Sequence, residues 1–525
     1  MEPSQLIIVS FYFALIFGVG IYATRFVKDS TDFLLAGRRL GLLLATAALA
    51  ATHFGGGFVV GTGEWGYTYG LTGMAYAVGV GLALLVLAIV AAKRMRRLGL
   101  VTVPDYLEHR YNSKTARLLG ALLSLIAIIG ILGAQVWASQ GALSILGIDP
   151  VTAAVIATLI FIVYTAASGL WGVTLTDAVQ LAIIFVGIPV AAVMGLQSAG
   201  GFEGIRETLA ATGLDSGTLA GLDSGTAAVT ADATGTATGT TNTAANAATA
   251  AANTGSGFGP GIDPDAYFHP LGAGGAMVVA AILPAIMYTL IGQDFYQRLF
   301  AARDEKIAVR AAALAGGILI LYAAFPAIAG MAARGIFGAD IEPSQAIPML
   351  VAEVLPAWIG AIVVAAIIGA IMSTADSLLV AGTSHLTHDI FGKLMRPDLA
   401  GDTRRMLLIS RIGTVVIGLL ALFLALYIQR IIDLLLLSYT MYAAGVFVPV
   451  VLGLYWPRGT AAGAVAGIAG GSLAGLAAAR GWIAVAELPL IAGMPSIVLG
   501  ALVSLVLYVA VSLVARQPDA WDKVR

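Results

Sequence analysis

The chain has 525 residues, of which 59% are hydrophobic and 11% are charged, and its mean hydropathy is +0.93. A soluble domain carries about 25% charged residues, so this composition indicates an integral membrane protein. The formal net charge of -1 gives no reason to expect nucleic-acid binding. The absence of cysteine excludes disulfides, thiolate metal sites and cysteine nucleophiles.

The first apolar run, Leu6 to Phe26, lacks a basic start and is long enough to cross a bilayer, which takes roughly 20 apolar residues. We therefore expect a membrane span there and no cleavable signal peptide. Apolar runs separated by polar or Gly/Pro breaks predict thirteen spans in all, with approximate limits 5–26, 42–62, 70–92, 117–146, 150–168, 173–197, 272–292, 307–332, 356–384, 406–428, 432–455, 459–479 and 487–514.

The basic residues test this number, because cytoplasmic loops collect Lys and Arg. With the N-terminus outside, 24 of the 28 basic residues fall on the cytoplasmic side. The four that remain outside, Arg206, Arg334, Arg430 and Arg480, are each alone in their loop. The alternation predicts a multi-pass protein of the cell membrane with its N-terminus outside and its C-terminus in the cytoplasm.

The second predicted span contains ATHFGGGFVVGTGEWGY, Ala51 to Tyr67. Gly55, Gly56 and Gly57 each weaken a helix by about 1 kcal/mol relative to alanine. They either allow close helix packing or interrupt the helix so that its backbone faces a polar cavity, as in transporters built from inverted repeats. The neighbouring His53 either senses protons or donates one hydrogen bond.

Two further features precede the second half of the chain. Asp177, near the inner end of the sixth span, is either a helix-start charge or a functional carboxylate. Residues 199–268 are rich in Ala, Thr, Gly and Asp and contain a near-repeat, LDSGTLAGLDSGT. Such a composition buries too little apolar surface to offset its ordering entropy, so we expect a disordered external insert.

The seventh span, Gly272 to Gly292, carries Pro284, which removes one backbone donor and obstructs a helix. If spans two to six form one half and spans seven to eleven the other, both halves begin with an interrupted span. Each half has five spans, and an odd number inverts the second half relative to the first. This is the outline of two five-helix inverted repeats.

The ninth span, AAIIGAIMSTADSLLVAGTSHLTHDI, contains Ser373, Thr374, Asp376 and Ser377. The hydroxyls either donate hydrogen bonds to carbonyls one turn back or serve as ligands of a cation. An intramembrane carboxylate such as Asp376 is costly and usually functional. Since hard cations prefer oxygen ligands, two hydroxyls and the carbonyls of a broken helix suit a sodium ion.

Four pieces together resemble the sodium:solute symporter family, namely FLLAGR followed by the GGG segment, SGLWGVTLTDAVQ, QDFYQRLFAARD and AIMSTADSLL. The likeness runs from Asp32 to Ala464 and implies a sodium-coupled importer with a LeuT-like fold and discontinuous first and sixth core helices. It also implies a sodium site with carbonyl ligands at Ala51, Phe54 and Ala370 and hydroxyl ligands at Ser373 and Thr374. The functional aspartate of the family falls on Asp177, and an aromatic gate falls near Tyr288.

The chain departs from this pattern around the break. His53 stands where relatives often carry Trp or Asp, and sugar-binding side chains are replaced by Gly55, Gly56 and Gly57, which argues against a sugar. The run from Gly55 to Leu71 resembles the choline-transporting branch, which also has a triple glycine and an acid–aromatic pair, and aromatic rings can bind a quaternary ammonium. Trp65, Tyr67 and Tyr69 form either such a surface or an external interface belt. Amino acids and small carboxylates remain open as solutes.

The predicted organisation has five parts: an N-terminal span and loop (1–41), a first repeat (42–198), the insert (199–268), a second repeat (269–455) and two peripheral spans with a short tail (456–525). We expect a symporter for a small organic solute, with sodium as the coupled ion and Asp177 and Asp376 as coupling residues. A proton-coupled symporter using His53 or Asp177 and a passive channel are the alternatives. No convergent nucleophile and base suggests an enzyme, and the oligomeric state is not specified.

Overall fold

The computed structural model describes residues 3–145, 147–215, 263–399, 401–427, 431–483 and 495–515. Within these ranges the chain is helical, with one isolated backbone bridge between Leu40 and Ala302. Nine helical segments there are long and apolar enough to cross a membrane, or ten when one sharply bent pair is counted as a single span. The prediction of an all-α, multi-pass membrane protein is therefore confirmed.

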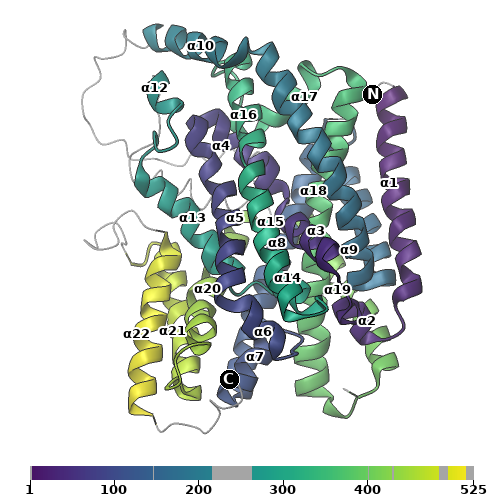
Figure 1. Ribbon diagram of the computed structural model, residues 1–525, viewed down its shortest axis with the longest axis vertical. Helices are drawn as coiled ribbons and strands as arrows, with labels where there is room; N and C mark the ends of the chain where they lie inside the picture. The colour runs from purple at the N-terminus through teal and green to yellow at the C-terminus, as the bar shows by residue number, and fades with distance from the viewer. Residues whose placement is uncertain are drawn as a thin grey trace.

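The long helices run side by side, with α1 at one edge of the molecule and α21 and α22 at the opposite edge (Figure 1). Their bounds are α1 Pro3–Ala23, α5 Ala75–Leu87, α8 Lys114–Ser144, α9 Pro150–Ser198, α15 Glu305–Tyr322, α16 Ala324–Phe337, α18 Ala357–Ser384, α19 Thr403–Tyr427, α20 Ile431–Gly453, α21 Ala461–Ala479 and α22 Ser496–Val514. Shorter helices connect them: α2 Ser30–Leu35, α6 Lys93–Arg97, α7 Val103–Tyr111, α17 Ala346–Glu353 and the π-helical η8 His385–Met395.

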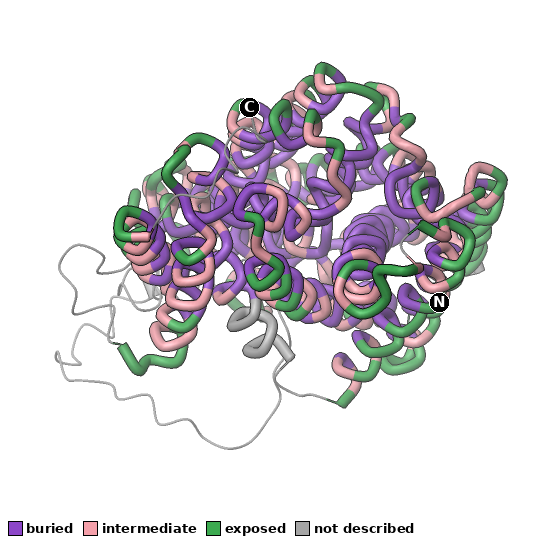
Figure 2. The backbone as a smooth tube through the Cα atoms, turned by 90° about the horizontal axis from the view of Figure 1, so that it is seen from below, coloured by how far each residue is buried: buried purple, intermediate pink, exposed green. Residues whose placement is uncertain are grey.

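Burial separates a central helix from peripheral ones (Figure 2). In its most apolar window the span containing α18 is 78% buried, whereas α1 and α22 are each 28% buried. The peripheral helices carry exposed apolar side chains such as Phe11 and Val506, which suit contact with lipid. Because α18 is enclosed by protein, its polar residues need partners on neighbouring helices.

The predicted interruption at the glycine triplet is confirmed. Helix α3 covers Leu42–His53, a π-helical turn η3 covers Gly57–Gly61, and α4 continues over Thr62–Tyr69. Phe54 ends α3, and its N–H bonds back to the carbonyls of Ala50 and Ala51. The glycines thus start a new helical segment and do not continue the old one.

The second interruption lies elsewhere than predicted. Pro284 sits inside α13, Gly275–Thr289, and the chain bends by 50° at Leu290–Gly292 before α14, Gln293–Ala301. Placing the break at Pro284 was wrong because the helix accommodates a proline, and the Pro284 carbonyl accepts a hydrogen bond from Tyr439 (2.9 Å). All nine residues of α14 are buried, so this segment is no cytoplasmic loop.

Helix α9 contains the predicted boundary between the fifth and sixth spans. Gly169 has φ 55° and ψ −145°, values that an L side chain rarely adopts, and a Cβ at this position would collide with the Phe33 carbonyl. The helix therefore turns at Gly169 and continues to Ser198. Asp177 lies two turns beyond this point, too far along for a helix-start charge.

The expected disorder of residues 199–268 is wrong at both ends of that segment. Helix α10 covers Gly201–Asp215, and α12 covers Pro264–Tyr267. The buried Tyr267 donates a hydrogen bond to the Gly66 carbonyl (2.7 Å), which ties this end of the insert to α4. The composition of the segment does not reveal this contact, because it depends on one buried tyrosine. Residues 216–262 lie outside the described ranges.

Candidate functional site

Oxygen atoms gather where the end of α3 meets the middle of α18. Ser373 Oγ donates to the carbonyls of Ala51 and Ala370, both at 2.9 Å. Thr374 Oγ1 lies 2.9 Å from the Thr52 carbonyl and 3.4 Å from the Ala370 carbonyl. Four residues predicted from the family pattern thus adjoin one another, on helices more than 300 residues apart in the chain.

Two details differ from the predicted ligand set. The Thr52 carbonyl, which the sequence reasoning missed, shares the Thr374 hydroxyl. Phe54 caps α3, and the described contacts of its ring are with Phe58, Phe185 and Tyr322. None of the described hydrogen bonds joins the Phe54 carbonyl to the two hydroxyls.

The three glycines serve this junction in different ways. A Cβ on Gly55 would lie 2.6 Å from Thr374 Oγ1, so a larger residue would push α18 away. The N–H of Gly56 donates to Gln135 Oε1 on α8 (3.3 Å). Gly57 begins η3 and lines the adjoining cavity. Close packing and an opened backbone, the two readings of the triplet, therefore both apply.

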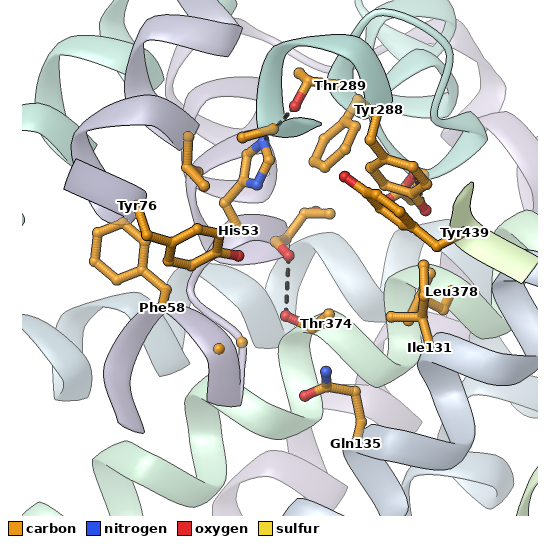
Figure 3. A pocket seen from close by; sticks show the side chains of 17 residues that line it. His53, Phe58, Tyr76, Ile131, Gln135, Tyr288, Thr289, Thr374, Leu378 and Tyr439 are labelled. Carbon is orange, nitrogen blue, oxygen red and sulfur yellow. Dashed lines mark hydrogen bonds between the residues drawn. The ribbon is translucent and has the colours of Figure 1, made fainter. Parts of the chain in front are cut away.

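A cavity of about 100 Å³ adjoins the oxygen cluster (Figure 3). Thr374 belongs to both, since its hydroxyl points to the α3 backbone and its side chain lines the cavity. The lining residues come from both interrupted helices and from α5, α8, α18 and α20: Thr52, His53, Gly55, Gly57, Phe58, Tyr76, Val80, Ile131, Gln135, Ala285, Tyr288, Thr289, Asp294, Phe295, Thr374, Leu378 and Tyr439.

Aromatic rings form much of this wall. Tyr288 stacks on Tyr439 with ring centroids 4.8 Å apart, and His53 stacks on Phe295 at 4.1 Å. The Tyr288 hydroxyl lies 3.5 Å from Asp294 Oδ1. Among the lining residues Asp294 is the one carboxylate, and no Lys or Arg is present. Such a wall suits a cation, because ring faces and a carboxylate both attract positive charge.

Most of the predicted solute-site residues reach this cavity. His53, Gly55, Gly57 and Tyr288 line it, and Gly56 adjoins it through Gln135. Near Thr289, the imidazole of His53 is 3.5 Å from the threonine hydroxyl, a single contact of the kind expected for a hydrogen-bonding histidine (Figure 3).

Sequence reasoning missed the aromatic and acidic parts of the wall. Tyr76 and Tyr439 lie in long apolar helices, where tyrosines are common and carry no signal of their own. Asp294 belongs to the QDFYQR motif, whose likeness to the family does not by itself give this acid a role. Trp65, Tyr67 and Tyr69, which were considered as an ammonium-binding surface, are not among the residues that line the cavity.

The two predicted coupling acids lie behind the oxygen cluster. Asp376 is fully buried, accepts a hydrogen bond from Tyr164 and lies 3.4 Å from the Thr165 hydroxyl. Asp177 is also fully buried, and its Oδ2 lies 3.5 Å from the guanidinium of Arg298 on α14. The structure therefore groups the acids with partners on α9 and α14, and neither is among the residues that line the cavity.

A polar cluster anchors the far end of α18, where the helix continues into η8. Arg117 of α8 is almost fully buried and pairs with Asp389 (2.7 Å), Asp105 (2.9 Å) and Glu108. Asp105 lies on α7, outside the spans. Burial raises the pKa of Asp105, but His388 and Arg117 outweigh it and hold the pKa well below its usual value. The cluster fixes α18 to α7 and α8.

Comparison with known families and proteins identifies this arrangement. Residues 33–471 match the family model of the sodium:solute symporter family. The chain is 26% identical over 498 residues to the high-affinity choline transporter 1 of Caenorhabditis elegans, covering 88% of this chain and 76% of that protein. It is 27% identical over 472 residues to the sodium/pantothenate symporter of Escherichia coli (strain K12), with 86% of each covered.

The fold is also that of a solved transporter. A substrate-bound, outward-open structure of a sodium-coupled sialic acid symporter superimposes with a TM-score of 0.76 and 19% sequence identity, covering 98% of both chains. A nucleobase-cation-symport-1 family transporter superimposes less closely, with a TM-score of 0.56 and 14% identity. The match to the family model covers most of the chain, and the named relatives are transporters and not enzymes. The chain belongs to the sodium:solute symporter family.

Proposed function

We propose that this protein imports a small organic cation together with sodium by alternating access. The observation that carries this proposal is the convergence of the Ser373 and Thr374 hydroxyls on the opened end of α3, directly beside an aromatic cavity. Family membership supports sodium coupling in general, whereas the choice of solute rests on the cavity itself.

The sodium site we propose consists of the carbonyls of Ala51, Phe54 and Ala370 and the hydroxyls of Ser373 and Thr374. All are oxygen donors, as a hard alkali cation requires. None carries a formal charge, so the ion brings its own charge into a fully buried junction. That charge is balanced at longer range by Asp376. We propose Asp376 and Asp177, which pairs with Arg298, as coupling residues.

The cavity composition supports a cationic solute. Asp294 would attract positive charge, and the stacked pair of Tyr288 and Tyr439 would present aromatic surface to it. A carboxylate solute would meet Asp294 without a Lys or Arg to offset the repulsion. Several relatives are named as choline transporters, and choline, a small quaternary ammonium, has this chemistry.

We further propose thirteen membrane crossings arranged as two inverted five-helix repeats, 42–198 and 269–455. The repeats would be flanked by 1–41 and 456–525 and separated by the external segment 199–268. Each repeat begins with an interrupted helix, α3 to α4 or α13 to α14, which supports the pairing. The N-terminus would be outside the cell and the C-terminus in the cytoplasm, as the basic residues indicate.

In this mechanism sodium joins α3 to α18 and completes the cavity wall that contains Thr374. Solute binding then favours closure of the cavity toward the outside of the cell and its opening toward the cytoplasm. Low sodium inside the cell releases the ion, and the membrane potential assists, since one charge crossing 100 mV is worth about 2.3 kcal/mol.

Uptake into proteoliposomes tests the proposal, with radiolabelled choline, proline and pantothenate as probes. Each probe is offered under an inward sodium gradient, under an inward proton gradient without sodium, and without any gradient. We expect choline to accumulate above equilibrium under the sodium gradient alone, and to leave when a sodium ionophore is added.

The other outcomes identify the alternatives. Sodium-driven accumulation of proline or pantothenate in place of choline would keep symport and overturn the cationic solute. Accumulation under the proton gradient would make the protein a proton-coupled symporter. Equilibration without any gradient would make it a passive facilitator.

A further inference from the structure

Arg298, on the inner half of the second interrupted helix, is fully buried and binds three other helical segments. Its Nε donates to the Ala48 carbonyl on α3 (3.3 Å), and its Nη2 donates to Ser377 Oγ on α18. The same Nη2 lies 3.5 Å from Asp177 Oδ2 on α9. A buried guanidinium is costly unless such partners compensate it, so its position depends on all three segments.

Of the three neutral acceptors of this guanidinium, the Asp294 carbonyl lies on α14 itself (2.8 Å), whereas Ala48 and Ser377 adjoin the proposed sodium site. Ser377 lies one turn after Ser373 and donates to its carbonyl (2.6 Å). Ser377 Oγ is also 3.1 Å from Thr52 Oγ1, and the Thr52 hydroxyl in turn donates to the Ala48 carbonyl (2.7 Å). The acceptors therefore stay in place only while α3 and α18 keep their present register.

Helix α14 borders the cavity and is also bonded to segments outside it. Asp294 and Phe295 face the cavity, whereas Gln293 Nε2 donates to the Val101 carbonyl (3.0 Å) and Gln297 Nε2 to the Leu34 carbonyl (2.8 Å). Leu34, on α2, and Val101 lie in connections between spans that the basic-residue pattern places in the cytoplasm. In the proposed mechanism, solute that leaves on that side passes α14.

We propose that Arg298 is the positioning residue that couples occupancy of the sodium site to closure of the inner exit. This rests on the proposed symport function. An ion that joins α3 to α18 keeps Ala48 and Ser377 close enough for one guanidinium to bind both, and the guanidinium holds α14 in place. When the ion leaves, the acceptors separate and α14 is released. Asp177 stays beside the guanidinium and compensates its charge while the other bonds are broken.

Accessibility of α14 from the cytoplasmic side tests this coupling. Because the chain has no cysteine, Ala301→Cys introduces a single reactive thiol on buried α14. Its labelling rate by a membrane-impermeant maleimide, in inside-out vesicles, is measured with sodium and with potassium. We expect sodium to slow labelling at least tenfold in the Ala301→Cys protein.

Adding Arg298→Gln should leave labelling fast in both salts, while sodium still raises the melting temperature of the purified variant. Arg298→Lys should restore part of the sodium protection. If Arg298→Gln does not fold, Ser377→Ala removes one acceptor and should reduce the protection at least threefold. The control is Arg110→Gln, since Arg110 is another buried arginine, bonded to Gly453 and Trp456 away from the site, and its loss should leave the protection intact.

The failures are distinguishable. Sodium protection that is unchanged in both the Arg298 and the Ser377 variants, with sodium-driven uptake intact in the parent protein, overturns the role of Arg298 alone. Absence of sodium protection together with absence of sodium-driven uptake in the parent protein overturns the proposed symport.

Discussion

The first interrupted helix, α3 to α4, and the second, α13 to α14, both border the same cavity but supply different groups to it. Around the first break the chain has Gly55, Gly56 and Gly57, and the polar groups that it presents to α18 are backbone carbonyls. After the second break α14 places the side chains of Asp294 and Arg298 in the interior.

In the proposed function this difference would allow two neighbouring binding sites, one for sodium and one for an organic cation. Neutral carbonyls and hydroxyls suit a bare cation that must also leave, whereas a fixed carboxylate suits a bulkier organic cation that cannot be enclosed by backbone. In the proposed mechanism the first break therefore binds the ion, and the second break recognises the solute and carries the closing segment. The following substitutions separate these two roles.

The largest effect is expected at the ion site. Replacing Ser373 and Thr374 together by alanine removes two hydroxyl ligands, each worth about 1.5–3 kcal/mol as a bond to a charged group. Sodium-driven uptake should fall at least about 100-fold, measured in proteoliposomes. Thr383→Ala is the matched control, because that buried hydroxyl lies on the same helix but pairs with Thr414. Normal sodium dependence in the double variant would remove this site from consideration.

The next effect concerns the second break. Asp294→Asn keeps the shape of the side chain and removes its charge, so the half-saturating concentration of choline should rise about 10- to 100-fold, on the order of 1.5–3 kcal/mol. The sodium concentration for half-maximal thermal stabilisation should change less than threefold. Asp304→Asn, at a half-exposed acid, serves as control. An equal loss of sodium and choline affinity would mean that the two breaks do not bind sodium and solute separately.

Gly55→Ala probes the first break with a single added methyl group. Its Cβ would lie 2.6 Å from Thr374 Oγ1, and overpacking of this kind costs about 1–3 kcal/mol. We expect sodium affinity to fall about tenfold, read from sodium-dependent thermal stabilisation. Gly18→Ala, where no atom lies within 4 Å of the added Cβ, should behave like the parent protein. An unchanged sodium affinity would show that α18 can move away from the added methyl group without weakening sodium binding.

The smallest effect is expected from Tyr439→Phe. The ring keeps its stacking on Tyr288, and only the hydrogen bond to the Pro284 carbonyl is lost, worth about 0.5–1.5 kcal/mol. Choline affinity should fall no more than about tenfold in competition assays, and less than with Tyr439→Leu, which removes the ring. Equal losses in the two variants would argue against a role for the aromatic face.

The two breaks also differ in how well the sequence predicts them. A run of three glycines weakens a helix locally, so its effect is visible in the sequence, and the Ser373–Thr374 pair follows from the family motif. The position of the second break was not predicted correctly, because Pro284 is a stronger local signal for a helix interruption than Gly292. Helix α14 resembles a polar loop because Arg298 and Asp294 are charged, and their burial depends on Asp177, Ser377 and α18, which no single stretch of sequence contains.

Equilibrium binding of ²²Na⁺ to the purified protein tests the central claim most directly, because it needs no knowledge of the solute. We predict saturable binding to the parent protein that unlabelled sodium displaces and potassium does not, and no such binding to the variant with both Ser373→Ala and Thr374→Ala. Saturable ²²Na⁺ binding of unchanged affinity in that folded variant would contradict the assignment of the ion site to the junction of α3 and α18.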